Sequence, residues 1–189
     1  MAKLAAVMVA PPVLTDDPDL AQPPDGWRVQ GRVHLPDPAA TARLAQAMAS
    51  QLRPGDSLLL QGRLGAGKSH FARALIRALI GPGGQTAEVP SPSFTLVQTY
   101  DTPHGEVWHA DLYRLADPQE MPELGLDLAM DQAICVIEWP DRFAPDWPHG
   151  AVCLRLETQA GAPDARHLGL IAAPGCDLAA RLLPVVAQA

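Results

Sequence analysis

The feature that most constrains this chain is residues 62–69, which read G-R-L-G-A-G-K-S. The order of one Gly, four residues and then Gly-Lys-Ser is typical of a phosphate-binding P-loop. Its glycines let backbone N–H groups turn toward an anion, and the helix that follows directs its positive end to the same point. The segment predicts a nucleotide site in which Lys68 binds the β- and γ-phosphates and the Ser69 hydroxyl ligates Mg²⁺.

The flanking residues supply the elements that such a loop joins. An apolar run at 57–61 follows the turn signal R-P-G-D and predicts a buried strand. After the loop, apolar residues recur at helical spacing up to the stop signal G-P-G-G at 81–84. This order of strand, loop and helix favours a P-loop over an ordinary Gly-rich turn.

Composition limits the class of protein. The 189 residues suffice for one domain, and no apolar run has the length of a membrane span. The net charge of −7 argues against general electrostatic binding to nucleic acid. Three widely spaced cysteines indicate neither a disulfide framework nor a zinc site. We expect a cytoplasmic protein with no membrane association, although residues 3–10 faintly resemble a short secretory signal.

The chain begins with a segment of different composition. Residues 1–26 are rich in Ala, Pro and Asp and predict a flexible N-terminal extension, followed by a single domain at 27–189. A strand is expected over 27–35, with a break at Gly31. A helix should then start with Asp37 as its N-cap and Pro38 in its first turn.

A proline-bracketed loop lies between the predicted helix and the next strands. It carries three hydroxyls, on Ser91, Ser93 and Thr95. In nucleotide hydrolases such a loop can order around the γ-phosphate as a switch. A surface loop with solvated hydroxyls explains the same residues, and the sequence leaves both interpretations open.

Two acidic residues end predicted strands. A β-hairpin over 94–100 and 106–112 brings Asp111 near a strand end, where α/β folds place ligands, although a turn-initiating Asp is the alternative. The apolar run before Glu138 resembles a Walker B strand, whose acid holds Mg²⁺. His109 lies on the same strand face as Asp111, and a structural role is the preferred interpretation. Trp139 could cover the nucleotide, but packing is slightly favoured.

The last segment predicts a second antiparallel hairpin, over 151–158 and 166–172, and a short closing helix over 176–183 that ends at Pro184. Arg166 could reach a phosphate or an acid, but a solvated surface position is expected. Together these elements predict an α/β fold like that of P-loop NTPases. It is a three-layer sandwich with a mixed, mainly parallel central sheet, helices on both faces and antiparallel hairpins.

Four linked motifs resemble the bacterial TsaE (YjeE) family, the small ATPase of tRNA threonylcarbamoyladenosine synthesis. They are G-R-L-G-A-G-K-S-H-F at 62–71, P-S-P-S-F-T-L-V at 90–97, H-A-D-L-Y-R-L at 109–115 and I-E-W-P at 137–140. The resemblance covers about residues 29–183. Ser69 and Ser93 stand where the family usually has Thr; Ser69 keeps the hydroxyl that Mg²⁺ needs.

The resemblance implies a protein that binds ATP or ADP with Mg²⁺ and hydrolyses ATP. It would support the TsaB–TsaD pair, which transfers threonylcarbamoyl to adenosine 37 of tRNAs reading ANN codons, and would contact tRNA only through that pair. Lys68 and Asp111 would be catalytic, and Ser69 and Glu138 would hold the metal. The nucleotide would contact Gly62, Leu64, Gly65, Ala66, Gly67, Lys68, Ser69 and, near the base, Asp37.

Hydrolysis is expected to be weak alone and stimulated by partners, because no Arg is placed as an obvious finger, although Arg114 is a candidate. Two other classes stay open. A small-molecule or nucleoside kinase usually needs an Arg-rich lid, which is not found after residue 115. A nucleotide-dependent interaction module would bind ATP without useful hydrolysis.

Overall fold

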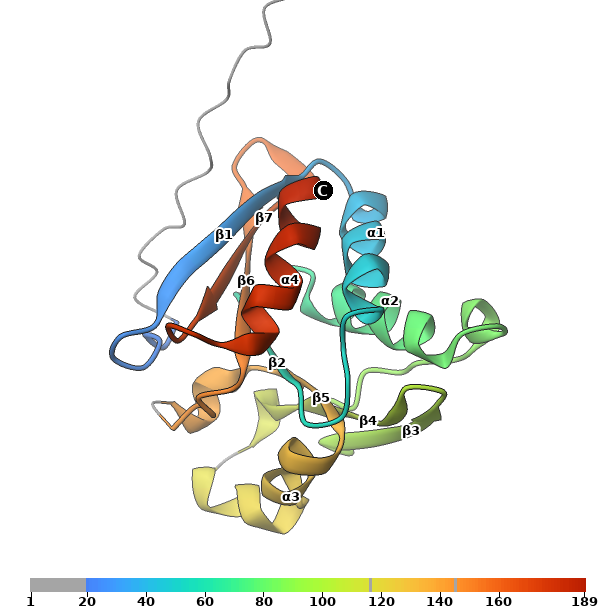
Figure 1. The fold of residues 1–189 in the computed structure, drawn as a ribbon, viewed down its shortest axis with the longest axis vertical. Helices are drawn as coiled ribbons and strands as arrows, with labels where there is room; N and C mark the ends of the chain where they lie inside the picture. The colour runs from blue at the N-terminus through green and yellow to red at the C-terminus, as the bar shows by residue number, and fades with distance from the viewer. Residues whose placement is uncertain (1–19, 116, 145) are drawn as a thin grey trace, which may run out of the picture.

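The computed structural model describes residues 20–189 except 116 and 145. Seven strands form one sheet in the order β1-β7-β6-β2-β5-β4-β3 (Figure 1). The strands are β1 (Arg28–Leu35), β2 (Ser57–Gln61), β3 (Val97–Thr102), β4 (Gly105–Asp111), β5 (Ile134–Glu138), β6 (Val152–Gln159) and β7 (Ala162–Ala172). The neighbouring strands β4, β5, β2 and β6 are parallel, whereas β3, β7 and β1 join by antiparallel pairing. Five strands therefore run in one direction, and β3 and β7 run in the other.

Helices cover both faces of the sheet. The α-helices are α1 (Pro38–Ala49), α2 (Lys68–Ile80), α3 (Leu126–Gln132) and α4 (Asp177–Gln188), and the 3₁₀ turns are η1 (Gly84–Thr86), η2 (Leu112–Arg114), η3 (Pro118–Leu124) and η4 (Pro140–Phe143). α1, α2 and α4 share one hydrophobic core with the sheet (Figure 1). α3 and η4 contribute to a second core with the opposite face. The predicted three-layer arrangement with helices on both faces is confirmed.

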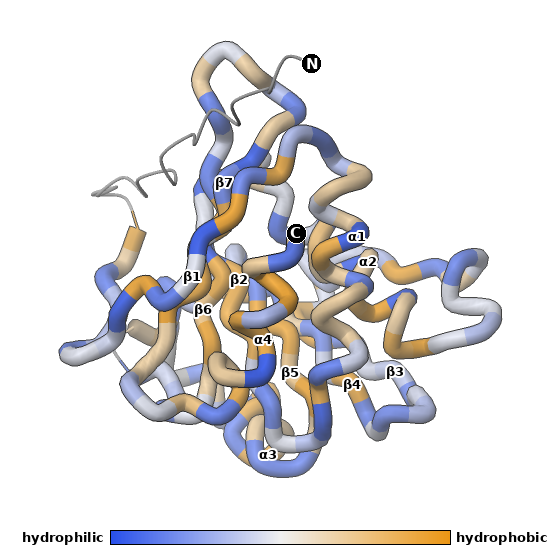
Figure 2. Tube along the Cα trace, turned by 45° about the horizontal axis from the view of Figure 1, so that its top comes forward, coloured by the Kyte–Doolittle hydropathy of each residue, from blue (hydrophilic) through white to orange (hydrophobic). Residues whose placement is uncertain are grey.

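The central strands are apolar because both of their faces are covered. Leu58 and Leu60 point into the core beneath α1 and α2, while Leu59 between them belongs to the opposite core. Every residue of β2 and β5 is buried. Figure 2 shows the apolar residues gathered in these central strands. Parallel strands buried on both faces carry continuous apolar runs of this kind.

Most predicted elements are confirmed, with shifted ends. Asp37 caps α1, since its Oδ1 accepts a hydrogen bond from Ala40 N at 2.6 Å. Both hairpins are antiparallel, and β1 has a register shift between Val29 and Gly31. The predicted end of the last helix at Pro184 is wrong, because α4 continues to Gln188. Burial of Val186 two residues later stabilises this last turn despite the missing N–H donor of the proline.

The chain before β1 contacts the rest of the domain next to the Gly-rich loop. Residues 1–19 of the predicted flexible extension lie outside the described residues. Leu20 is buried, and the backbone N–H of Ala21 donates to Asp141 Oδ1 at 2.7 Å. The side chain of Gln61 donates both to Ala21 O at 2.8 Å and to Asp141 Oδ1 at 2.7 Å. These bonds attach the segment to η4 and to the last residue of β2.

Candidate active site

The Gly-rich loop joins the end of β2 to the start of α2, as the sequence predicts. Gly62 has φ of 150°, and a Cβ atom there would lie 2.4 Å from the carbonyl oxygen of Leu156 on β6. Any larger residue would therefore push the loop away from the sheet. Gly67 is the N-cap of α2, with φ of 102°, and no side chain caps this helix end. Its first N–H groups thus remain donors for an anion.

Lys68 folds back over the loop that carries it. Its Nζ donates to the carbonyl oxygens of Gly62 at 2.6 Å and Arg63 at 3.0 Å, and lies 3.6 Å from the centre of the Trp139 ring. Burial lowers the pKa of Lys68 from 10.5 to about 8, against the opposing effect of the nearby carboxylates of Glu138, Asp111 and Asp141. Lys68 must exchange these carbonyl partners to bind a phosphate.

The two predicted acids meet at the end of adjacent parallel strands. Asp111 on β4 is paired in register with Glu138 on β5. Glu138 Oε2 accepts a hydrogen bond from Ser69 Oγ at 2.8 Å, and its Oε1 lies 2.9 Å from Nε2 of His109. Both carboxylates are buried beside the start of α2. The pairing of β4 with β5 thus brings the two acids together, next to the Ser69 hydroxyl at the start of α2.

Asp111 connects the sheet to the proline-bracketed loop. Its Oδ2 accepts from Ser91 Oγ at 3.0 Å, and its Oδ1 accepts from the backbone N–H of Tyr113 at 3.1 Å. The loop returns to the strand through Leu96, whose φ of 61° is uncommon for a residue with a side chain. Its carbonyl oxygen accepts from Asp111 N at 2.9 Å. Asp111 is therefore bonded to this loop through both its side chain and its backbone.

These residues line a cavity of about 380 Å³. Ten of the residues that the sequence analysis assigned to the site line this cavity, namely Leu64, Gly65, Gly67, Lys68, Ser69, Ser91, Ser93, Asp111, Glu138 and Trp139. Gly62 and Ala66 also belong to the loop, but both are buried and neither lines the cavity. The exposed Thr95 does not line the cavity. Two of the three hydroxyl residues of the predicted switch loop, Ser91 and Ser93, therefore line the cavity together with the acids.

Asp37 and Arg166 lie at the edge of the site. A cavity of about 160 Å³ between the start of α1 and the Gly-rich loop is lined by Pro38, Thr41, Gly67, His70, Asp164 and Arg166. Asp37 itself is engaged in capping α1. Arg166 is not a solvated surface residue as expected, because it donates to the carbonyl oxygens of Ala66 at 2.9 Å and Gly65 at 3.2 Å. It supports the loop from behind.

Arg114, the candidate finger, lies outside the cavity. Its guanidinium stacks over the ring of Phe94 at 4.2 Å from the ring centre. Phe94 is 81 % exposed, so the pair is on the surface. Arg73 on α2 is instead the arginine among the residues that line the cavity, and its Nε donates to Ser69 O at 2.9 Å.

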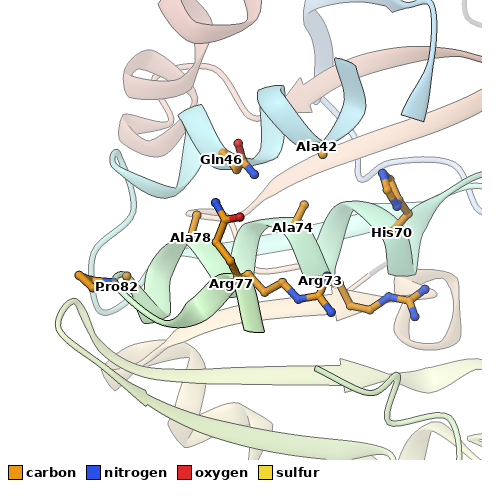
Figure 3. Close-up of a pocket in the computed structure, with 10 residues that line it drawn as sticks. Ala42, Gln46, His70, Arg73, Ala74, Arg77, Ala78 and Pro82 are labelled. Atoms are coloured by element: carbon orange, nitrogen blue, oxygen red, sulfur yellow. The ribbon is translucent and has the colours of Figure 1, made fainter. Parts of the chain in front are cut away.

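A larger cavity, of about 810 Å³, lies beside α1 and α2. Its lining includes Gln46, Arg73 and Arg77 and the small side chains of Ala42, Ala74 and Ala78 (Figure 3). It shares His70 and Arg73 with the cavity of about 380 Å³, called the smaller cavity below, but contains no carboxylate. We assign the chemistry to the smaller cavity, because the lysine, the hydroxyls and both acids line it.

The oxygen donors in the smaller cavity suit Mg²⁺ better than a soft metal. No cluster of three or more His, Cys, Asp or Glu side chains that could hold a metal occurs within the described ranges. Ser69 Oγ and Glu138 Oε2, 2.8 Å apart, offer two hard oxygens. Mg²⁺ is usually held by one or two carboxylates together with substrate phosphates rather than by an all-protein cage. This donor set therefore fits a magnesium ion that arrives with a nucleotide.

Sequence reasoning missed several contacts of this site. It did not assign Tyr113, His70 and Arg73 to the cavity, and it gave His109 no link to Glu138. The placement of His109 on the same strand face as Asp111 was the available signal. The partner strand could not be identified from the sequence, because β4 and β5 are separated by η2, η3 and α3.

Residues 35–168 match the profile of TsaE, described as the threonylcarbamoyl adenosine biosynthesis protein TsaE. This chain belongs to the TsaE family. The matched range contains the Gly-rich loop, both acids and the loop at Ser91. Membership places the chain in threonylcarbamoyladenosine biosynthesis and confirms the resemblance seen in the four motifs.

Individual TsaE proteins support this assignment. The tRNA threonylcarbamoyladenosine biosynthesis protein TsaE of Rickettsia bellii is 43 % identical over 101 residues, which are 53 % of this chain and 68 % of the relative. That of Rickettsia felis is 42 % identical over 101 residues, or 53 % of this chain and 57 % of the relative, so this match spans little over half its length.

A solved structure supports the fold. The crystal structure of YdiB from Bacillus subtilis superposes with a TM-score of 0.65 at 24 % identity, covering 85 % of this chain and 97 % of YdiB. At that identity the likeness concerns the fold alone. Across the described part of the chain, no helix is long and apolar enough to cross a membrane.

Proposed function

We propose that this TsaE protein is a P-loop ATPase, which binds ATP or ADP with Mg²⁺ in the cavity between the Gly-rich loop and the ends of β4 and β5. One observation carries the proposal. Lys68 and Ser69 at the start of α2, Asp111 at the end of β4 and Glu138 at the end of β5 come from three separate elements, and they line one cavity. A cation, a hydroxyl and two carboxylates at a helix start are the groups that nucleotide hydrolysis requires.

Binding follows from the loop and the residues that begin α2. The N–H groups at the start of α2, which no side chain caps, bind the phosphates, and Lys68 releases Gly62 and Arg63 to contact them. Ser69 and Glu138 would hold Mg²⁺, which when bound neutralises charge on the phosphates. The cavity lined by Pro38 and Thr41, next to the Asp37 cap, is the proposed location of the base.

Asp111 is the proposed catalytic carboxylate, which positions the attacking water. Its buried carboxylate lines the cavity together with Lys68 and can accept a hydrogen bond from the attacking water. Its bond to Ser91 couples hydrolysis to the loop that carries Ser93. We propose that this loop, with Thr95 at its outer end, acts as the γ-phosphate switch.

The partners proposed for the chain are TsaB and TsaD, with tRNA reached through that pair. This TsaE would support the transfer of threonylcarbamoyl to the tRNA adenosine without performing the transfer itself. A single arginine, Arg73, is found among the described residues that line the cavity, and Arg114 is stacked on Phe94. Turnover should therefore be slow until partners supply or reposition a positive group, which can contribute about 10³–10⁵ in rate.

The same geometry weighs against a kinase. Phosphoryl transfer to an acceptor needs several positive groups around the transferred phosphate. Among the described residues of the lining Arg73 is the single arginine, beside Lys68, so the cavity lacks the Arg-rich lid that a small-molecule kinase usually needs. An interaction module without hydrolysis would not require Asp111 at this place.

The test is Mg²⁺-dependent ATP hydrolysis by the purified chain, alone and with TsaB–TsaD and tRNA. We expect TsaB–TsaD to stimulate ATP hydrolysis by the unmodified chain, and we expect Lys68→Ala to abolish that stimulation. Arg77→Ala is the matched control, because Arg77 is on the same helix but does not line the smaller cavity. ATP binding without stimulation by active TsaB–TsaD would retain the nucleotide site and overturn the proposed partnership.

A further inference from the structure

His109 is a buried histidine that is hydrogen-bonded to Glu138. Its side chain is fully buried on β4, and Nε2 lies 2.9 Å from Glu138 Oε1. An ionised carboxylate only accepts, so Nε2 carries the hydrogen and donates a hydrogen bond to Glu138 Oε1. Nδ1 is buried and has no hydrogen-bond partner in the described part of the chain. Among the described residues, the bond to Glu138 is thus the one polar side-chain contact that offsets burial of this ring.

Packing alone does not explain an imidazole at this position. Two residues earlier on the same strand face, Val107 is fully buried in the apolar core. Another apolar side chain at 109 would extend that core without leaving a ring nitrogen unpaired, which costs free energy. A histidine here has a physical advantage only through what it does to Glu138.

Glu138 has competing attractions within the cavity. Ser69 Oγ donates to its Oε2, and the nearby carboxylate of Glu138 raises the pKa of Lys68 more than the carboxylates of Asp111 and Asp141 do. A carboxylate free to rotate would be drawn toward that ammonium group and withdrawn from Ser69. The His109 bond holds the opposite oxygen, Oε1, deep in the sheet. It therefore leaves Oε2 directed at Ser69.

We infer that His109 is a positioning residue, which fixes Glu138 so that Oε2 and the Ser69 hydroxyl present their oxygens together to a divalent cation. This inference rests on the proposed function, since it assigns His109 a role at the proposed Mg²⁺ site. Hydrogen-bonded partners of metal-binding carboxylates commonly tune metal affinity in this way.

The experiment measures ADP binding by calorimetry in EDTA and across a Mg²⁺ titration. His109→Leu removes the donor and should raise the Mg²⁺ concentration for half-maximal tightening about 10–100-fold, with affinity in EDTA changed less than about twofold. His109→Gln places a side-chain N–H at a similar reach and should stay within about threefold of the unmodified chain. Asn is shorter, so His109→Asn should resemble His109→Leu.

Val107→Ala is the matched control, because it opens a cavity on the same strand face without touching Glu138. It should lower the melting temperature while leaving the Mg²⁺ titration unchanged. If His109→Leu does not fold, the comparison of Gln with Asn decides the question alone.

Three results would overturn the inference. They are an unchanged Mg²⁺ titration in the variants that lack the donor, equal impairment by Gln and Asn, and an equal loss of affinity in EDTA. A different result marks failure of the proposed function itself, namely an unmodified chain whose ADP binding is indifferent to Mg²⁺ or absent.

Discussion

Asp111 and Glu138 are register partners at the last residues of β4 and β5, and each accepts a hydrogen bond from a different serine hydroxyl. Ser91 donates to Asp111, and Ser69 donates to Glu138. The two acids thus divide the site into a part facing the proline-bracketed loop and a part facing the Gly-rich loop. Substitutions at each acid should therefore have separable effects.

Asp111→Asn is expected to separate hydrolysis from binding. The amide keeps the size and the oxygen that accepts from Tyr113 N, but it is a poor acceptor for a proton from water. Turnover should fall about 10²–10⁴-fold while ATP affinity changes less than about threefold. Steady-state hydrolysis and calorimetry check the two quantities. Unchanged turnover would exclude Asp111 from the reaction.

Lys68 should make nucleotide binding depend on pH. Burial lowers its pKa to about 8, and bound phosphates must raise that pKa because they stabilise the charged form. Binding therefore takes up a proton above pH 8, and affinity should fall up to about tenfold per pH unit there, with little change below pH 7. Calorimetry between about pH 6.5 and about pH 9.5, a range that brackets the pKa of Lys68, tests whether affinity falls as the pH rises.

Lys68→Arg is the control for this pH dependence. Arg stays protonated throughout the range, so its weaker binding should not vary with pH. An equal decline with pH in the two proteins would assign the effect to another group.

Trp139 should report the arrival of a nucleotide. Its ring is 3.6 Å from the ammonium group of Lys68, which has to move to reach a phosphate. We expect ATP to change the tryptophan fluorescence of the unmodified chain and of Trp108→Phe, but not of Trp139→Phe. Trp108 is a fair control because its Nε1 is bonded to Glu106, away from the cavity. Loss of the signal in Trp108→Phe alone would contradict the assignment.

Asp37 should contribute to stability through its cap of α1. Asp37→Ala removes the acceptor for Ala40 N and should lower the free energy of unfolding by about 1 kcal/mol. Asp37→Asn keeps an acceptor and should lie within about 0.3 kcal/mol of the unmodified chain. Urea unfolding measures both. Equal losses in the two variants would show that the charge, not the cap, is what matters.

The sequence was most informative where local chemistry determines local structure. The Gly-rich loop between β2 and α2, the Asp37 cap and the strand that ends at Glu138 all follow from patterns within about ten residues. The two hairpins follow from alternation and from turn residues. These predictions needed no knowledge of which strands become neighbours.

The rest depends on contacts between distant segments. The bond of His109 to Glu138 requires the pairing of β4 with β5, and the bonds of Arg166 to Gly65 and Ala66 require β7 to lie behind the loop. Continuation of α4 beyond Pro184 depends on burial of Val186, which overrides the local preference of proline. Such contacts become visible only once the sheet order is known.

The central claim is that the cavity containing Lys68 and Glu138 is the nucleotide site. Calorimetric titration of Mg-ATP into the unmodified chain, Lys68→Ala and the surface control Arg114→Ala tests it most directly. We predict one bound ATP per chain, a loss of at least about tenfold in affinity for Lys68→Ala and no change for Arg114→Ala. Equal affinities in all three proteins, or no ATP binding by the unmodified chain, would contradict the account.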